Sequence, residues 1–142
     1  MLFQRVNRTD QEKVFVVVTN AQGATLTTGL PVAWATGASN DGKLVVKADA
    51  AADYRGFIGI AVQDIANNDE GRVQIGGFCN SILLSNAGTS VTINAGDPLV
   101  PAPAGMYSAA PTYANSGFKY VIASNVPVAL SAAAYASGII RM

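Results

Sequence analysis

Alternation of apolar and polar residues with a period of two is the feature that most constrains what this chain can fold into. In GFIGIAVQD, Ile58, Ile60 and Val62 lie on one side of an extended chain, and smaller or polar residues lie on the other. The same alternation recurs in RVQIG (72–76), SVTIN (90–94) and FKYVIAS (118–124). Successive side chains of a β-strand point to opposite faces, so this period is typical of strands with one buried face. The sequence therefore predicts β-strands along much of its length.

Residues that favour turns separate these segments at short intervals. Asn, Asp and Gly tolerate left-handed backbone angles, and they gather at 20–23, 40–42, 67–71, 86–88, 94–97 and 115–117. Many short strands at such spacing predict an all-β fold, which we expect to be a single compact β-barrel or sandwich.

Two segments depart from the alternation. KVFVVVTN (13–20) is apolar on both faces, which predicts a strand that is covered on both sides. ADAAADY (48–54) is the best candidate for a helical turn.

The chain of 142 residues is long enough for one domain with a single core. We expect residues 14–142 to form this β domain and residues 1–13 to form an N-terminal arm. Leu2 and Phe3 are apolar, but a polar and charged stretch follows them. Chain ends are usually disordered unless something ties them down.

Leu2 and Phe3 are therefore candidate anchors in a pocket or groove of a neighbouring subunit, where an extended arm can add a strand to a sheet. Arg5 and Arg8 are candidate partners for acidic groups on a binding surface. The alternative, in which Phe3 caps its own barrel, has equal weight.

Charge is scarce in this chain. Charged residues make up 13% of it and the formal net charge is zero, whereas soluble proteins carry about 25% charged residues. Without a basic excess there is no electrostatic footprint for nucleic acid. No apolar run approaches the roughly 18 residues that a membrane helix needs. We therefore expect neither nucleic acid nor membrane as a partner, and we expect part of the surface to be covered by other protein.

The residue types that most often carry chemistry are rare. The chain has no His and only one Cys, which removes the most common general base and any site built on several cysteines. Cys79 lacks an activating His, so a buried core thiol is the better interpretation. A carboxylate pair such as Asp64 and Asp97 can serve a glycosidase, but nine acidic residues allow many such pairs. We expect no catalysis, no cofactor and no metal.

The acidic stretch QDIANNDEGRVQIGG (63–77) resembles a calcium-binding loop in composition only. An EF-hand requires ligands at positions 1, 3 and 5, Gly at 6 and Glu at 12. Counting from Asp64, these positions include Ala66, Asp69 and Ile75, so the pattern fails at three points. The flanking segments alternate as strands do, which favours a plain hairpin loop.

Trp34 is the one further candidate for a binding residue. It alternates with Val32 in PVAWATG, which favours packing in the core or an interface over a platform that stacks on a sugar.

Four segments together resemble the capsid decoration, or cement, proteins of tailed double-stranded DNA bacteriophages. They are TTGLPVAWATG, GFIGIAVQDIANNDEGRVQIGGF, AGDPLVPAPAGMYSA and AAAYASGIIRM, and the resemblance covers roughly residues 25–142. It lies in the order of elements: a Gly-(Ile/Val)-Ala strand, a loop, a Gly-x-Val-x-(Val/Ile)-x-Gly strand, and a Gly-Asp turn that opens another strand.

The resemblance implies a non-enzymatic structural virion protein that binds the outer surface of the capsid and stabilises the shell. It implies the major capsid protein as a partner, self-association as a homotrimer, and synthesis in the cytoplasm of the bacterial host. No catalytic residues are carried over.

Two alternatives from other classes remain. One is a carbohydrate-binding β module of a phage fibre or surface protein, in which Trp34, Tyr107 and Tyr113 form an exposed platform. The other is a small β-fold enzyme that uses only carboxylates, whose signature is a deep pocket holding two acidic residues.

Overall fold

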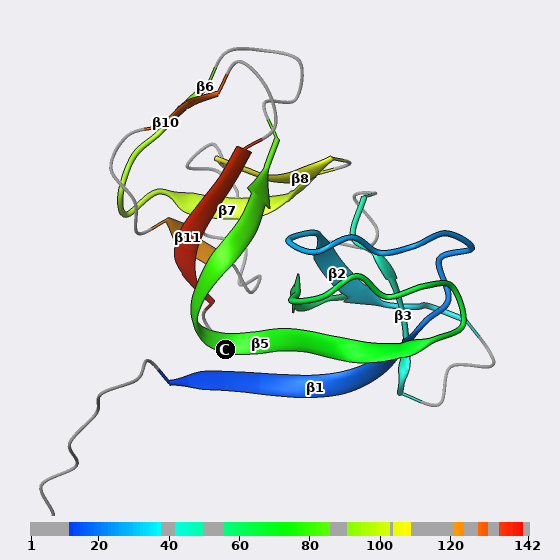
Figure 1. The fold of residues 1–142 in the computed structure, drawn as a ribbon. Helices are drawn as coiled ribbons and strands as arrows, with labels where there is room; N and C mark the ends of the chain where they lie inside the picture. The colour runs from blue at the N-terminus through cyan, green and yellow to red at the C-terminus, as the bar shows by residue number, and fades with distance from the viewer. Residues whose placement is uncertain are drawn as a thin grey trace, which may run out of the picture.

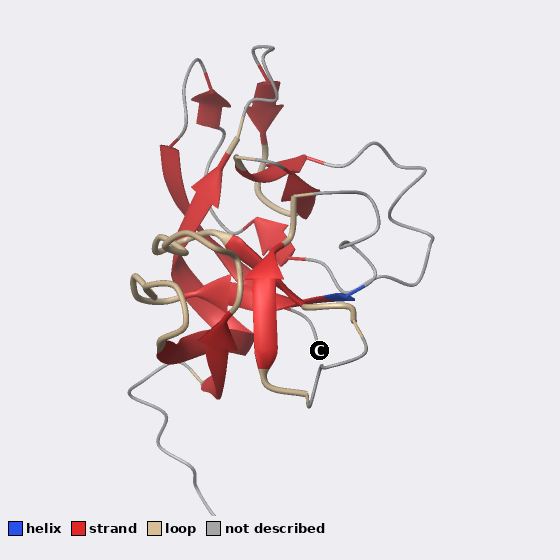
Figure 2. Ribbon diagram, turned by 90° about the vertical axis from the view of Figure 1, so that its right-hand side faces the viewer, coloured by secondary structure: helices blue, strands red, loops and turns tan. Residues whose placement is uncertain are grey.

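Strands and loops make up nearly all of the described chain, as the all-β prediction requires (Figure 2). The structure, a computed structural model, describes residues 12–37, 42–49, 56–85, 91–102, 104–108, 121–123, 128–130 and 134–140. Its strands are β1 (Lys13–Asn20), β2 (Pro31–Trp34), β3 (Leu44–Lys47), β4 (Phe57–Ala61), β5 (Glu70–Leu84), β6 (Val91–Ile93), β7 (Pro98–Ala102), β8 (Gly105–Ser108), β9 (Val121–Ala123), β10 (Val128–Leu130) and β11 (Ala134–Ile140).

The large sheet of the described residues closes on itself twice. Its strand order is β1-β3-β2-β4-β5-β11-β9-β7-β8, with additional β1–β5 and β5–β8 pairings. The first of these pairings closes an N-terminal ring of β1, β3, β2, β4 and β5. The second closes a C-terminal ring of β5, β11, β9, β7 and β8. The rings share β5, which extends from one to the other in Figure 1. A separate small sheet pairs β6 with β10.

Each ring has its own hydrophobic core, and β4 contributes to both. The core of the N-terminal ring includes Ile58 together with Val18, Val32 and Val73. The core of the C-terminal ring is centred on β5, β7, β9 and β11, and it also takes in Phe57 and Ile60. Every residue of β4 is buried for this reason. β4 lies between the two cores and is covered on both faces, so the two rings pack as one unit.

β1 differs from the sequence prediction. Val18 is buried, but Phe15 is 43% exposed and Val17 is 61% exposed. The prediction that this strand is covered on both sides was therefore wrong. The inward side of β1, with Val16 and Val18, packs against the core of the N-terminal ring. Its outward side belongs to the outer surface of that ring, where no second core lies.

The long strand β5 bends where the two rings join. Its first half pairs with β1 and its second half with β11, and both pairings reach Gly77, opposite Lys13 and Ile140 respectively. Gly77 has a left-handed φ of 85°, and the β1–β5 register shifts between Val14 and Phe15. The shift leaves Ile75 without a partner on β1, two residues before Gly77. A bulge next to a left-handed Gly bends a strand sharply, and in Figure 1 β5 bends near the start of β1.

The loop between β4 and β5 confirms the hairpin prediction. β4 and β5 are antiparallel neighbours, and Asn68 in the loop has a left-handed φ of 66°. The buried Asn20 fastens this loop to the end of β1. Its amide donates to the carbonyl of Ile65 at 2.8 Å, and its own carbonyl accepts from the backbone N–H of Asn68 at 2.8 Å. The helical turn expected over 48–54 lies mostly outside the described residues, and residues 48 and 49 have no helical structure.

We expect excess chelator to leave the melting temperature of the protein unchanged, because protein donors already occupy oxygens of this loop. Asp64 accepts from the backbone N–H of Thr28 at 2.7 Å and from its hydroxyl at 2.9 Å, and Asn67 accepts from the N–H of Gly23 at 2.8 Å. Thermal unfolding with and without EDTA checks this. A fall of many degrees that calcium reverses would contradict the hairpin interpretation.

Candidate partner-binding surface

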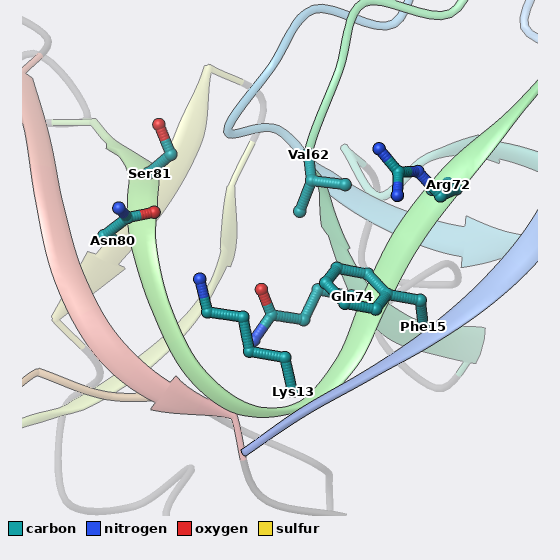
Figure 3. Close-up of a pocket in the computed structure, with 7 residues that line it drawn as sticks. All are labelled: Lys13, Phe15, Val62, Arg72, Gln74, Asn80 and Ser81. Carbon is teal, nitrogen blue, oxygen red and sulfur yellow. The ribbon is translucent and has the colours of Figure 1, made fainter. Parts of the chain in front are cut away.

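A groove of about 270 Å³ lies in the concave side of the β5 bend (Figure 3). Its lining comes from β1, from the loop after β4 and from both halves of β5: Lys13, Phe15, Val62, Arg72, Gln74, Asn80 and Ser81. The bend at Gly77 brings these segments together, since Gln74 precedes it and Asn80 follows it on the same strand.

Gln74 forms a fixed part of the groove. It is 2% exposed, and its amide nitrogen donates to the carbonyls of Gly76 at 3.1 Å and Phe78 at 2.9 Å. These two carbonyls belong to the residues on either side of Gly77, at the bend of β5. The side chain therefore provides a donor for backbone acceptors at the bend.

Arg72 is exposed at the edge of the groove, where it contacts two neighbouring side chains. Its guanidinium carbon lies 5.8 Å from the centre of the Phe15 ring, and its Nε donates to the amide oxygen of Gln63 at 3.4 Å. Val17 lies directly opposite Arg72 in the β1–β5 register. A cation over an aromatic face is a favourable contact, so the charge of Arg72 sits beside an exposed apolar surface.

The lining carries two positive charges, Lys13 and Arg72, and no carboxylate. Within the described residues, neither cation forms a salt bridge. An ion pair joins Lys47 and Asp49 at 3.1 Å, and neither residue lines the groove. The groove is thus a local positive region on a chain of zero net charge.

Among the described residues, the large hydrophobic side chains that are exposed lie on two strands, β1 and β11. They are Phe15 and Val17 on β1, and Tyr135 (58% exposed) and Ile139 (46% exposed) on β11. Both strands pair with β5 and both reach Gly77. Single exposed hydrophobic residues are normal on protein surfaces, but two successive outward positions of one strand, next to an ordered Arg, are typical of a contact surface.

Of the residues that the sequence singled out as partner-binding, only Trp34 is described. It lies at the end of β2, half-buried, and packs against the core of the N-terminal ring. This confirms the packing interpretation of its indole. Leu2, Phe3, Arg5 and Arg8 lie outside the described residues, as do Tyr113 and the side chain of Tyr107.

The residues considered for catalysis are buried in the core or hydrogen-bonded to the backbone. Cys79 is 1% exposed, and burial raises the pKa of its thiol, so the interpretation as a core thiol is confirmed. The backbone N–H of Thr28, followed by its hydroxyl, lowers the pKa of Asp64. Asp97 accepts from the N–H of Asn94 at 2.8 Å in the turn before β7. Asp64 thus links two loops, and Asp97 supports the turn in which it lies.

The described chain shows neither a metal centre nor a membrane-spanning helix. It contains no group of three or more His, Cys, Asp or Glu side chains placed to hold a metal ion. It also contains no helix that is long and apolar enough to cross a membrane.

The groove is not apparent from the sequence. Arg72 and Gln74 read as the polar side of an alternating strand, and Lys13 as the end of the arm. The one available signal was the Gly76–Gly77 pair inside a strand-like segment, because Gly in a strand interior often marks a bulge.

Comparison of the chain with protein-family models and with curated proteins gives no match.

Proposed function

We propose that this protein is a structural, non-enzymatic protein of a phage virion that binds the outer surface of the capsid and stabilises the shell. The observation that carries the proposal is the exposed apolar surface of β1, Phe15 and Val17, on a chain in which only 13% of residues are charged. When a protein partner covers such a surface, its apolar area is removed from water, which is favourable. The partners are the major capsid protein and further copies of the chain, as a homotrimer.

The order of elements supports the same function. The Gly-Ile-Ala segment forms β4, a loop follows, and the Gly-x-Val-x-Ile-x-Gly segment falls within β5. Gly96 and Asp97 form the turn that opens β7. These are the elements on which the resemblance to capsid decoration proteins rests.

A protein of this kind works by linkage. It binds the assembled lattice and not the dispersed subunits, so it lowers the free energy of the assembled state. An oligomer that contacts several lattice positions at once needs only modest affinity at each of them. Bound copies also slow the failure of a shell under internal pressure, which is a kinetic effect.

The direct test mixes the purified protein with expanded, undecorated capsids of tailed phages. Stoichiometric density on the outer surface in electron microscopy supports the proposal, and sedimentation across micromolar concentrations should show a trimer. Bare capsids, together with a strictly monomeric protein at every concentration, would contradict it. A sugar titration that changes Trp34 fluorescence would instead favour the carbohydrate-binding alternative.

Deletion of residues 1–8 should leave the melting temperature nearly unchanged and weaken capsid binding or trimer formation. The deleted segment precedes β1 by four residues, and it contains the four arm residues singled out in the sequence. Its arginines contribute little individually, since exposed ion pairs are typically worth about 0 to 1 kcal/mol.

Circular dichroism and capsid co-sedimentation of the full-length and shortened chains check this expectation. If the shortened chain unfolds, the segment belongs to the core. If it decorates capsids as tightly as the full chain does, the arm is dispensable for binding.

A further inference from the structure

We propose that the groove in the β5 bend binds an acidic side chain, Asp or Glu, of the shell protein, with the carboxylate between Lys13 and Arg72. The proposal rests on the function proposed above for the identity of the partner, and on the groove itself for the chemistry. The arm residues singled out in the sequence, Leu2, Phe3, Arg5 and Arg8, take no part in it.

Charge is the first reason. Lys13 and Arg72 come from different strands and lie on different sides of the groove in Figure 3. No carboxylate lines the groove, and neither cation forms a salt bridge among the described residues. Two cations that line one cavity make its potential positive, and this potential attracts an anion into the cavity. A carboxylate accepts hydrogen bonds from both Lys and Arg.

Size is the second reason. A volume of about 270 Å³ is at or below the lower end of pockets for drug-sized ligands, which begin at about 300 Å³. It suits one side chain rather than a larger ligand. Phe15 and Val62 provide apolar walls for the methylene groups of such a side chain, and Asn80 and Ser81 provide further polar groups for the ends of the carboxylate.

Order in the unbound state is the third reason. The Phe15 ring and the Gln63 amide already hold Arg72, and the two carbonyls beside Gly77 already hold Gln74. A planar guanidinium that already rests against an aromatic ring loses less conformational entropy when it pairs with a carboxylate. Figure 3 shows the amide oxygen of Gln74 turned toward the groove, where it can accept from a backbone N–H of the bound segment.

The chemistry is tested without any capsid. The folded protein is titrated with the acetylated amide of glutamate, and the amide signals of Gln74, Asn80 and Ser81 are followed by NMR. We expect saturable shifts in the millimolar range with this probe and none with the acetylated amide of glutamine, which has the same shape without the charge. Lys13→Gln or Arg72→Gln should each weaken binding about two- to fivefold, as is usual for a partly exposed charge.

Lys47→Gln is the matched control, since it removes one positive charge from β3 outside the groove and should leave the shifts unchanged. Equal shifts with the glutamate and glutamine probes, or equal weakening by all three variants, would overturn the proposal.

The partner is tested with undecorated capsids. Arg72→Gln should lower the affinity for capsids and reduce its dependence on salt concentration relative to Lys47→Gln, because salt screens exposed charges. If wild-type protein binds capsids and Arg72→Gln binds them equally well, the groove proposal fails and the proposed function stands. If neither the wild-type protein nor any variant binds capsids but the glutamate probe still saturates, the proposed function fails and the carboxylate site stands. A variant that changes the sedimentation of the free protein would place the acidic side chain on a second copy of this chain and overturn the assignment to the shell.

Discussion

Replacement of Gly77 by Ala should destabilise the protein by about 3 kcal/mol or more, the largest effect that we expect from any single methyl group in this chain. A Cβ at this position would overlap the carbonyl oxygen of Glu12 and lie 2.9 Å from its carbonyl carbon. Backbone atoms cannot turn aside as a flexible side chain does, so β1 would have to move away from β5. The left-handed φ of 85° adds strain for any residue with a Cβ.

Gly23→Ala is the matched control for this variant. Gly23 has nearly the same φ, 82°, but a Cβ there meets no atom within 4 Å. We expect it to cost about 1 kcal/mol or less, because the strain of a left-handed residue is partly offset by the reduced freedom of the unfolded chain. Urea unfolding of the two variants measures the difference, which isolates the contact with Glu12. Equal losses at both positions would show that β1 does not approach the bend as closely as the structure places it.

Replacement of Gln74 by Leu should cost about 2 to 4 kcal/mol. The side chain is 2% exposed, and its amide nitrogen donates to both carbonyls beside the bend. Leu has a similar volume but no donor, so both acceptors lose their partner, at about 1 to 3 kcal/mol for a buried polar group. The same replacement at Gln63, which is only half-buried and holds Arg72 by a single long contact of 3.4 Å, should cost less than about 1 kcal/mol.

Gln74→Glu adds a dependence on pH whose sign follows from the same contacts. The new carboxylate would face two carbonyl oxygens in a buried position, so its pKa in the folded state should be raised above the value of about 4.3 in the unfolded state. The folded state then binds the proton more tightly, and stability relative to wild type should fall as the pH rises from about 4 toward 7. Melting temperatures of the variant and the wild type across this range check it. A difference that does not change with pH would show that the carboxyl reaches water.

Local pattern was sufficient for the fold class and for several individual elements. The alternation around Ile58 and Val73 predicted β4 and the first half of β5, and the run of Asn and Gly between them predicted the hairpin loop. Cys79 was expected in the core and lies there. These features depend on side-chain periodicity and on the left-handed tolerance of turn residues, both of which can be read along the chain.

The closure of the sheet into two rings could not be read in this way. It depends on pairings between strands distant in sequence, β1 with β5 and β5 with β8, and a period of two does not say which strand is the neighbour. Because the sequence pattern does not identify neighbouring strands, it also did not distinguish the burial of β4 from that of β1. Both read as strongly apolar, yet β4 lies between the two cores and is fully buried, whereas β1 lies on the outside and exposes Phe15 and Val17.

By itself, the sequence determined that this chain is an all-β protein of short strands with little charge, because hydrophobic period, turn residues and composition are local properties. Only the tertiary structure decided where its candidate site lies. Gly77 lets one strand serve two rings, and the bend that results brings Lys13, Arg72 and Asn80 to one groove. Lys13 is far from the other two in the sequence, and Arg72 and Asn80 belong to opposite halves of one long strand. A binding site is defined by proximity in space, which strand pairing and bending create and composition does not record.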